Sequence, residues 1–469
     1  MSAPTGGKKG GSGAGRQHEP LPDAAEVELA YLIAVDTGTD DGWSAEESLG
    51  ELAALVETAG GEVVGSTFQR RESIHPLWYL GSGKAEELKQ TKASTHFTLV
   101  VADDELSPKQ QRSLEDLLNV KVLDRTGVIL DIFAQRAHTH EGRIQVELAR
   151  LEYQLPRLTR LWTHLSRMGG GIGTRRGPGE TQLETDRRVL RERIKKTRER
   201  VDEVRRRRET AARARERRLL PTVAIVGYTN AGKSTLLNAL VGEEAAVAED
   251  MLFATLDPTT RRVRLHEGQT VIVSDTVGFI HKLPHQLIDA FQATLEEVTR
   301  ADVLLEVVDL ADRHAVEHRR TVQTVLDELG AGHKPRVVVL NKADLVEDGR
   351  DGPPEVLGPL VPDRSVPGGV LGRNDRFAVR ASALSGTGID ELRDMIATVL
   401  ADLWLDIDVA VPYSAGDLLA RVRERGTVEF EYRDEDVRIH GRVPPSMAGD
   451  LRDAALAWER ALKDRKATP

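Results

Sequence analysis

The string GYTNAGKS, Gly227–Ser234, has the residue types and spacing of a phosphate-binding loop. Thr222–Val226 before it is patterned as a buried strand, and a helix is expected over Thr235–Val241. Glycines let backbone N–H groups converge on phosphate oxygens, Lys233 is expected to reach the β- and γ-phosphates, and the Ser234 hydroxyl to ligate Mg²⁺. The loop residues predicted to bind nucleotide are Gly227, Tyr228, Thr229, Asn230, Ala231, Gly232, Lys233 and Ser234.

Two further segments are expected to complete the site. DTVG follows the strand-like Val271–Val273, which places the Asp275 carboxylate beside Mg²⁺ and the Gly278 N–H toward the γ-phosphate. FATLD lies where a switch segment belongs, and Thr255 is the expected second hydroxyl ligand of Mg²⁺ once a γ-phosphate orders it. Thr259 and Thr260 are the nearest alternatives, and in a purely structural role Thr255 would cap a turn. The predicted contacts are Phe253, Ala254, Thr255, Leu256, Asp257, Asp275, Thr276, Val277 and Gly278, with Lys233, Thr255, Asp275 and Gly278 as the catalytic set and Ser234 and Thr255 as metal ligands.

Recognition of the base is expected from two strings near the end of this region. NKAD follows the strand-like Arg336–Leu340, and the Asp344 carboxylate can accept hydrogen bonds from N1–H and the 2-amino group of guanine. Adenine offers neither donor. SAL follows Phe377–Arg380 and is expected to offer a backbone N–H to the guanine oxygen. The predicted base contacts are Asn341, Lys342, Ala343, Asp344, Ser382, Ala383 and Leu384.

Four such strings in order, each at a strand end, predict a P-loop GTPase domain over 220–405 that uses GTP, GDP and Mg²⁺. The segment 347–376, rich in Gly, Pro and Asp, is expected to be a surface insertion. One expected group is missing, because Ras-like enzymes place a water-orienting Gln directly after this glycine and here Phe279 and Ile280 follow. A phenyl ring cannot polarise water, so slow intrinsic hydrolysis with help from a partner is predicted.

The region 26–139 alternates strand-like and helical runs, which predicts a small parallel α/β domain. The expected strands are Leu29–Val35, Glu62–Phe68, Phe97–Asp103 and Val120–Asp124, and the expected helices are Ala45–Thr58, Lys84–Lys92 and Pro108–Leu118. Gly81–Lys84 precedes a helix, and a glycine-rich turn is preferred there over an anion site.

The region 140–219 has the spacing of two long helices joined by a glycine-rich tip, Gly169–Glu180. Pro156 is expected to kink or weaken the first arm. The second arm is densely basic over Arg187–Arg218, which suits either phosphate neutralisation on RNA or a solvated coiled-coil arm. The first arm's apolar positions are Leu148, Leu151, Leu155, Leu158, Leu161, Leu165 and Met168.

The rest of the chain constrains the class of protein. Residues 406–469 are expected to form a small α+β domain: a strand, a helix, a hairpin and a last helix. The chain has no cysteine, which excludes disulfides and thiol chemistry, and no apolar run long enough to span a membrane. Residues 1–25 read as a disordered tail that lacks the apolar segment of a secretory signal. A cytoplasmic protein is therefore expected, and a monomer is the default expectation. The net charge of −10 argues against indiscriminate nucleic-acid binding by the whole molecule.

Beyond the nucleotide motifs, the chain closely resembles the HflX family of translation-related GTPases from about Leu29 through the nucleotide domain. The segments that carry the resemblance, with FATLD and DTVGF, are Tyr79–Lys84, Asp103–Pro108, Asp124–Thr126, Ile129–Ala134, Gln145–Ala149 and Gly177–Glu184. The resemblance implies binding to the large (50S) ribosomal subunit, with the tip Gly169–Glu180 and the basic arm at ribosomal RNA. It also implies splitting or rescue of stalled or idle ribosomes under control of GTP. Two alternatives are a signalling GTPase with a coiled-coil scaffold arm, and an RNA-remodelling ATPase regulated by GTP.

Overall fold

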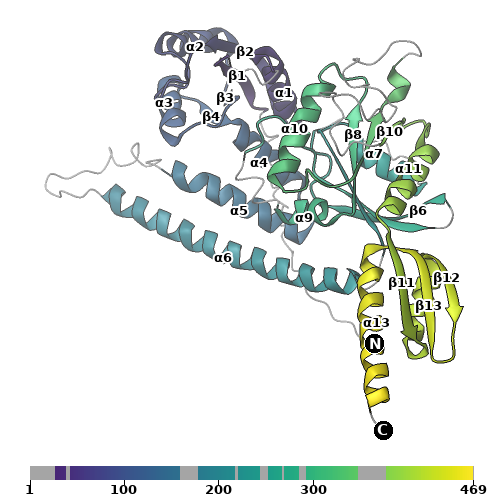
Figure 1. Cartoon of the computed structure of the whole chain (residues 1–469). Helices are drawn as coiled ribbons and strands as arrows, with labels where there is room; N and C mark the ends of the chain where they lie inside the picture. The colour runs from purple at the N-terminus through teal and green to yellow at the C-terminus, as the bar shows by residue number, and fades with distance from the viewer. Residues whose placement is uncertain are drawn as a thin grey trace, which may run out of the picture.

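The computed structural model describes residues 27–38, 43–158, 178–216, 220–242, 252–266, 269–284, 292–346 and 377–467. Three sheets follow one another along the chain, and a long helical pair projects from the side of the first two (Figure 1). The predicted tail, the predicted insertion and most of the predicted tip lie outside the described residues.

The first sheet has four parallel strands in the order β2-β1-β3-β4, which confirms the parallel α/β prediction. Successive residues of β1 face opposite sides: Leu32 and Ala34 pack with α1 and α4, whereas Ile33 and Val35 pack toward α2 and α3. The strands are β1 (Leu29–Asp36), β2 (Glu62–Arg70), β3 (Leu99–Ala102) and β4 (Lys121–Asp124). The helices are α1 (Ala45–Thr58), α2 (Ser82–Thr95), α3 (Pro108–Leu118) and α4 (Arg125–Arg136).

Helix α4 was not expected from the sequence. It begins directly after β4 without a loop, and the Asp124 side chain accepts a hydrogen bond from Gly127 N at 2.9 Å as its N-cap. The run Val128–Phe133 is buried on nearly every side, so no amphipathic period marks it as a helix.

The helical pair consists of α5 (His140–Arg157) and α6 (Pro178–Glu216), which lie side by side in Figure 1. Leu148, Leu151 and Ile194 form its buried seam. Pro156 lies in the last turn of α5, and helix α6 already begins at Pro178, inside the predicted tip. The 39 residues of α6 would span roughly 58 Å at 1.5 Å per residue. Leu161, Leu165 and Met168 fall outside the described residues.

The second sheet has six strands in the order β10-β9-β8-β5-β7-β6, of which β6 runs antiparallel to β7 and the other pairs are parallel. The carboxyl ends of parallel strands meet at one edge, which brings the predicted nucleotide strings together there. The strands are β5 (Thr222–Gly227), β6 (Thr259–Arg264), β7 (Thr270–Asp275), β8 (Val303–Asp309), β9 (Arg336–Asn341) and β10 (Phe377–Arg380). The helices are α7 (Lys233–Val241), α9 (Gln292–Arg300), α10 (Ala315–Glu328), the short η3 (Ala343–Leu345) and α11 (Ile389–Asp402).

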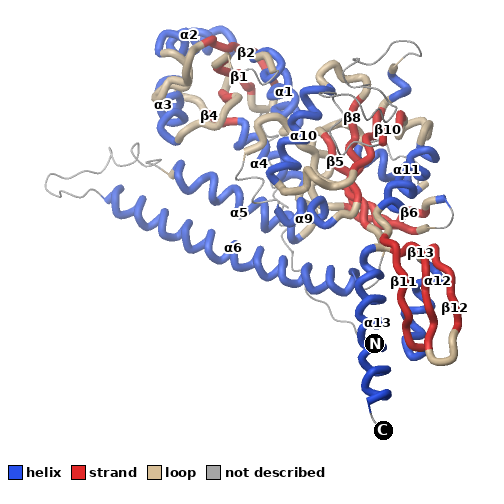
Figure 2. Tube along the Cα trace, viewed as in Figure 1, coloured by secondary structure: helices blue, strands red, loops and turns tan. Residues whose placement is uncertain are grey.

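The third sheet is antiparallel, in the order β11-β13-β12, and its apolar face is covered by two helices (Figure 2). Its elements match the predicted strand, helix, hairpin and last helix. They are β11 (Leu405–Pro412), η4 (Tyr413–Ala415), α12 (Gly416–Arg425), β12 (Thr427–Tyr432), β13 (Asp436–Val443) and α13 (Pro445–Ala467). Among the described residues, no helix is both long and apolar enough to cross a bilayer.

Candidate nucleotide site

The loop between β5 and α7 has a backbone that two of its glycines make possible. Gly227 and Gly232 have φ values of 150° and 90°, and Asn230 has 59°. A Cβ on Gly227 would lie 2.4 Å from Val307 O, and one on Gly232 would lie 2.3 Å from the side-chain nitrogen of Asn341. Larger residues at these two positions would therefore be strained and would also clash, so the loop depends on both glycines.

Three oxygen-bearing side chains from separate segments converge beside this loop. Ser234 Oγ lies 2.7 Å from Thr255 Oγ1, and both hydroxyls contact Asp275 Oδ2, at 2.6 and 2.9 Å. Thr260, one of the alternatives to Thr255, instead contacts Ser274 Oγ at 3.3 Å. Of these two threonines, Thr255 is therefore the one whose hydroxyl lies in the cluster, and its role as a metal ligand stays a prediction.

This cluster fits Mg²⁺, which prefers hydroxyl and carboxylate oxygens. The second carboxylate oxygen, Asp275 Oδ1, is buried and has no hydrogen-bond partner among the described residues. Burial raises the pKa of Asp275, while hydrogen bonds from Ser234 and the charge of Lys233 oppose that rise. A divalent cation at this place would satisfy the oxygen and stabilise the ionised carboxylate.

Lys233 is held close to the expected phosphate position. Its side chain is 7% exposed, and its Nζ donates to Tyr228 O at 2.6 Å. Burial lowers its pKa to about 8, although Asp275 acts in the opposite direction. A Cβ on Gly278 would lie 3.0 Å from Lys233 Nζ, so the DTVG glycine and the loop lysine face the same small space.

The base-recognition strings are joined to the phosphate loop through one amide side chain. Asn341 Nδ2 donates to Ala231 O at 2.8 Å, and Asn341 Oδ1 accepts from Ala383 N at 3.0 Å. Asp344 is exposed, and Leu384 is 75% exposed. The structure thus brings the NKAD and SAL segments together beside the loop.

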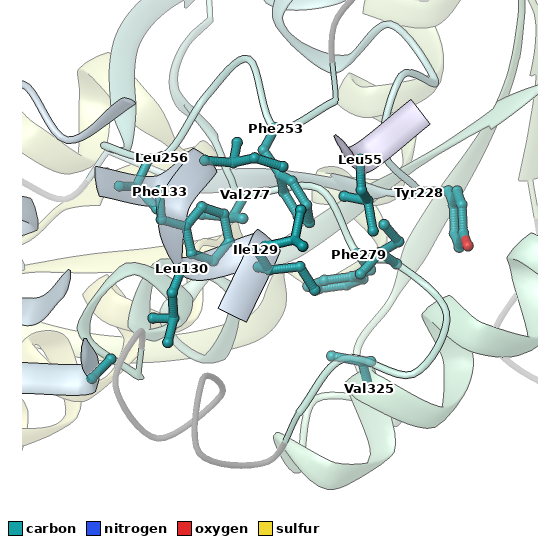
Figure 3. Close-up of a cluster of buried hydrophobic side chains, with 14 of the residues drawn as sticks. Leu55, Ile129, Leu130, Phe133, Tyr228, Phe253, Leu256, Val277, Phe279 and Val325 are labelled. Atoms are coloured by element: carbon teal, nitrogen blue, oxygen red, sulfur yellow. The ribbon is translucent and has the colours of Figure 1, made fainter. Parts of the chain in front are cut away.

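Several predicted nucleotide contacts direct their side chains away from this space. Phe253, Leu256, Val277 and Phe279 pack with residues of α1 and α4 in one apolar cluster (Figure 3). The rings of Phe253 and Phe133 meet edge to face at 4.7 Å. Phe279 is only 1% exposed, so the residue in place of the water-orienting Gln is a packing residue. The nucleotide contacts predicted for Phe253, Leu256 and Val277 stay predictions.

A buried polar network lies beside the apolar cluster, and sequence reasoning did not assign it a role. Arg125 is 1% exposed and donates to Glu51 at 2.6 Å, Asp103 at 2.7 Å and His281 O at 2.9 Å. Lys282 contacts Asp103 and Asp104, at 2.5 and 2.6 Å. The network therefore joins the segment after DTVG to the first domain.

The phosphate loop reaches the same network through one side chain. Tyr228 OH donates to Glu51 and accepts from His281 N at 2.8 Å. Asp103 and Arg125 belong to strings that carried the family resemblance, which was the available signal for this network. Their contacts cross from one domain to the other, so spacing alone did not show the partners.

Three protein-family profiles match the chain. They are described as GTP-binding GTPase N-terminal at residues 46–134, GTP-binding GTPase middle region at 136–215, and 50S ribosome-binding GTPase at 222–342. The GTPase HflX of Caldanaerobacter subterraneus subsp. tengcongensis is 44% identical over 435 residues, which are 92% of this chain and 95% of that protein. The chain belongs to the HflX family of GTPases.

Another curated relative agrees with that membership. The GTPase HflX of Escherichia coli strain K12 is 42% identical over 90% of this chain and 93% of that protein. A GTP-binding protein of Sulfolobus solfataricus, solved with GDP, covers 79% of this chain and 98% of its own at 24% identity and a TM-score of 0.39. This HflX-family chain is a GTPase that binds GTP and GDP, as its motifs predicted.

Proposed function

We propose that this GTPase acts on the large ribosomal subunit in the cytoplasm, with GTP binding and hydrolysis controlling its association. The observation that carries the proposal is the convergence of Ser234, Thr255 and Asp275 in a domain attached to a long basic helical pair. The match of 222–342 to a profile described as 50S ribosome-binding GTPase supports the partner.

In this proposal Ser234 and Thr255 ligate Mg²⁺, Asp275 stabilises it, and Lys233 neutralises charge on the β- and γ-phosphates. The bound ion supplies charge stabilisation during phosphoryl transfer. Phe279 packs against the first domain, so the chain offers no side chain at that position to orient water. We therefore propose slow hydrolysis by the free protein and stimulation by the ribosome.

The cationic side chains of α6 fall into two groups, those that pair with carboxylates of α5 and those that do not. Only the second group is available to bind RNA phosphates. Arg193 and Arg198 pair with Glu147 and Glu152 of α5, at 2.6 and 2.5 Å, and so hold the two helices together. Arg188, Arg191 and Lys195 are exposed and follow one face of α6 toward the tip. Within the described part of the chain, no ion pair engages these three, and we assign the phosphate contacts to them.

The first experiment is GTP hydrolysis by the purified protein with and without purified large subunits. We expect stimulation of roughly tenfold or more, since partners that complete a GTPase site raise the rate at least that much. Replacing 169–180 by a Gly/Ser linker should abolish the stimulation and leave basal hydrolysis intact. If no stimulation and no co-sedimentation occur with a non-hydrolysable GTP analogue, the ribosome is the wrong partner and a scaffold role takes its place.

The salt dependence of subunit binding tests the assignment of the cations. Changing Arg188, Arg191 and Lys195 together to Gln should reduce the slope of log affinity against log salt by about two to three. The matched control changes Arg193 and Arg198 to Gln, which should leave that slope nearly unchanged. Equal effects of the two variants would contradict the assignment.

Two substitutions test the nucleotide site itself. Lys233→Ala should lose most nucleotide affinity or turnover, and unchanged hydrolysis would refute the role of the loop. Asp344→Asn should weaken guanine binding and shift preference toward xanthine, whose 2-oxo group accepts a hydrogen bond. The nucleotide affinities of both variants are measured by titration in the absence of ribosomes.

The outcome on the ribosome is proposed to be splitting or rescue of stalled or idle particles. Light scattering of intact ribosomes mixed with the protein and a GTP analogue should fall if the subunits separate. A constant signal, together with release of bound peptidyl-tRNA, would favour rescue without splitting.

A further inference from the structure

The predicted switch segment, Phe253–Asp257, is anchored at three places that lie in three different parts of the molecule. Phe253 packs against Phe133 of α4 (Figure 3). The hydroxyl of Thr255 belongs to the cluster with Ser234 and Asp275. Asp257 contacts the start of α5, the first helix of the pair. Asp257 was among the predicted nucleotide contacts, but its carboxylate hydrogen-bonds to His138 and Thr139 and is not part of the Ser234–Thr255–Asp275 cluster.

Asp257 is tightly held at that helix end. Its carboxylate accepts from His138 N at 3.0 Å, from Thr139 N at 2.8 Å and from Thr139 Oγ1 at 2.5 Å. Thr139 is the N-cap of α5, and its hydroxyl oxygen accepts from Gly142 N at 2.9 Å. A Cβ on Gly142 would lie 2.4 Å from Asp257 Oδ1, so the carboxylate fits a space that only glycine leaves open. The partial positive charge of the helix start favours an anion there.

Thr255 and Asp257 are only two residues apart, so their Cα atoms can be no more than about 7 Å from each other. A displacement of Thr255 away from Ser234 must therefore either move Asp257 or break its contacts with α5. Conversely, a rotation of α5 would pull on Asp257 and so displace the segment Phe253–Asp257 that carries Thr255. Because Leu148 and Leu151 of α5 pack against Ile194 of α6, we expect the two helices to rotate together.

We propose that Asp257 is a positioning residue that couples the triphosphate site to the orientation of the α5–α6 pair. With Asp257 bound to the start of α5, the Thr255 hydroxyl is held toward Ser234 and Asp275. Binding of GTP at that site in turn fixes the orientation of the α5–α6 pair. Because coupling between two sites is reciprocal, a ligand on the pair must also change the affinity for GTP. This inference rests on the proposed role of Thr255 as a ligand present only with GTP.

The alternative is that Asp257 only caps a helix. Loss of a cap lowers stability but does not distinguish GTP from GDP, so nucleotide discrimination separates the two roles. Asp257→Ala should weaken binding of a fluorescent, non-hydrolysable GTP analogue by about tenfold in the presence of Mg²⁺, the size of a typical coupling, and leave GDP affinity unchanged. Thr139→Val should have a similar effect, whereas Thr139→Ser keeps the hydroxyl and should restore normal binding.

The matched control is Ser107→Ala. Ser107 is the N-cap of α3 in the first domain, and its hydroxyl accepts from Gln110 N at 3.3 Å. It lies far from the switch segment in sequence. This variant should lower the melting temperature without changing the ratio of GTP to GDP affinity. If Asp257→Ala behaves like Ser107→Ala, the coupling role is refuted.

A distance measurement tests the mechanical part directly. Because the chain has no cysteine, a pair of spin labels can be introduced at exposed Glu199 of α6 and exposed Glu391 of α11 without further substitutions. The distance between the labels should differ between GDP and the GTP analogue in the otherwise native protein, and should not differ with Asp257→Ala. Equal nucleotide dependence in both proteins would overturn the proposal, as would none in either.

These measurements need no ribosomes. A protein that shows the coupling but does not bind large subunits would therefore refute the proposed partner alone. One that binds large subunits in a GTP-dependent way, with Asp257→Ala unchanged in all assays, would refute the coupling alone.

Discussion

The contact region between the first two domains and the surface of the C-terminal sheet use the same ion-pair chemistry in opposite surroundings. Arg125 meets Asp103 at 2.7 Å, with both side chains 1% exposed. Arg438 meets Asp408 at a similar 2.6 Å, but both side chains are 44% exposed. Distance alone would rank the two pairs as equals. Burial separates them, because water screens the second pair and cannot reach the first.

The difference in burial shows which ion pairs require a single arrangement of their two domains or strands. A buried arginine costs desolvation free energy unless each of its carboxylate partners is in place, so the Arg125 network fixes how the first domain sits against the switch segments. The exposed pair between β11 and β13 carries no such desolvation cost, so it does not fix a geometry in the same way.

The largest effect is expected from Arg125→Met. The substitution leaves the carboxylates of Asp103 and Glu51 buried without their cation, which typically destabilises by about 3–5 kcal/mol. The measurement is the free energy of unfolding from urea denaturation. Arg438→Met is the matched control and should produce no resolvable change. Similar losses in the two variants would mean that burial does not separate these pairs.

A smaller effect is expected from Lys282→Met. Lys282 contacts the same Asp103 together with Asp104, but its own side chain is 30% exposed and Arg125 remains in place. We expect a loss of about 1–2 kcal/mol, the scale of a hydrogen bond to a charged group reduced by partial solvation. Urea denaturation is again the measurement, and a loss equal to that of Arg125→Met would show that Lys282 is the dominant cation.

The acid dependence of stability distinguishes the regions in another way. Burial by itself would raise the pKa of Asp103, but the charges of Arg125 and Lys282 outweigh it and hold that pKa well below the usual range. Since the folded pKa is below the unfolded value of about 3.9, the stabilisation is complete above pH ~5 and is lost as the pH falls below about 4.

Asp103→Asn should therefore remove part of this acid dependence and destabilise the protein at neutral pH. Burial raises the pKa of the neighbouring Glu51, so protonation of Glu51 stabilises the folded state as the pH falls and partly offsets the loss from Asp103 below about pH 4. Thermal melts between pH 3 and pH 7 measure both. An unchanged acid slope in Asp103→Asn would exclude this carboxylate as the source.

The smallest effect is expected from Asp408→Asn. A hydrogen bond from Arg438 lowers the pKa of Asp408, but the Asp408 side chain is 44% exposed, so water screens the pair. The melting temperature should stay within experimental error, and added salt should not change the comparison with the native protein. A marked, salt-sensitive loss would place this pair in a network larger than its direct contacts.

The parts of the fold that the sequence predicted are those whose signal is local. Gly227–Ser234 and the strings at Asp275, Asn341 and Ser382 lie at strand ends, and their spacing alone indicated the site. Helix α4 was not predicted, because Asp124 both ends strand β4 and caps the helix, so no turn separates the two elements. The contact between Asp257 and Thr139 was not predicted, because 118 residues separate the two and no spacing rule relates them.

The apolar cluster around Phe279 has a consequence for the order in which the newly made chain can fold. Its first half comes from residues up to Tyr153, and its second half runs to Ala331, roughly 180 residues later. At about 5–20 residues per second, synthesis of that stretch takes on the order of 10–40 s. During that time Phe133 lacks its partner ring Phe253, although first-domain residues of the cluster already pack around it. We therefore expect the newly made first domain to expose part of an apolar surface until the second domain has been synthesised.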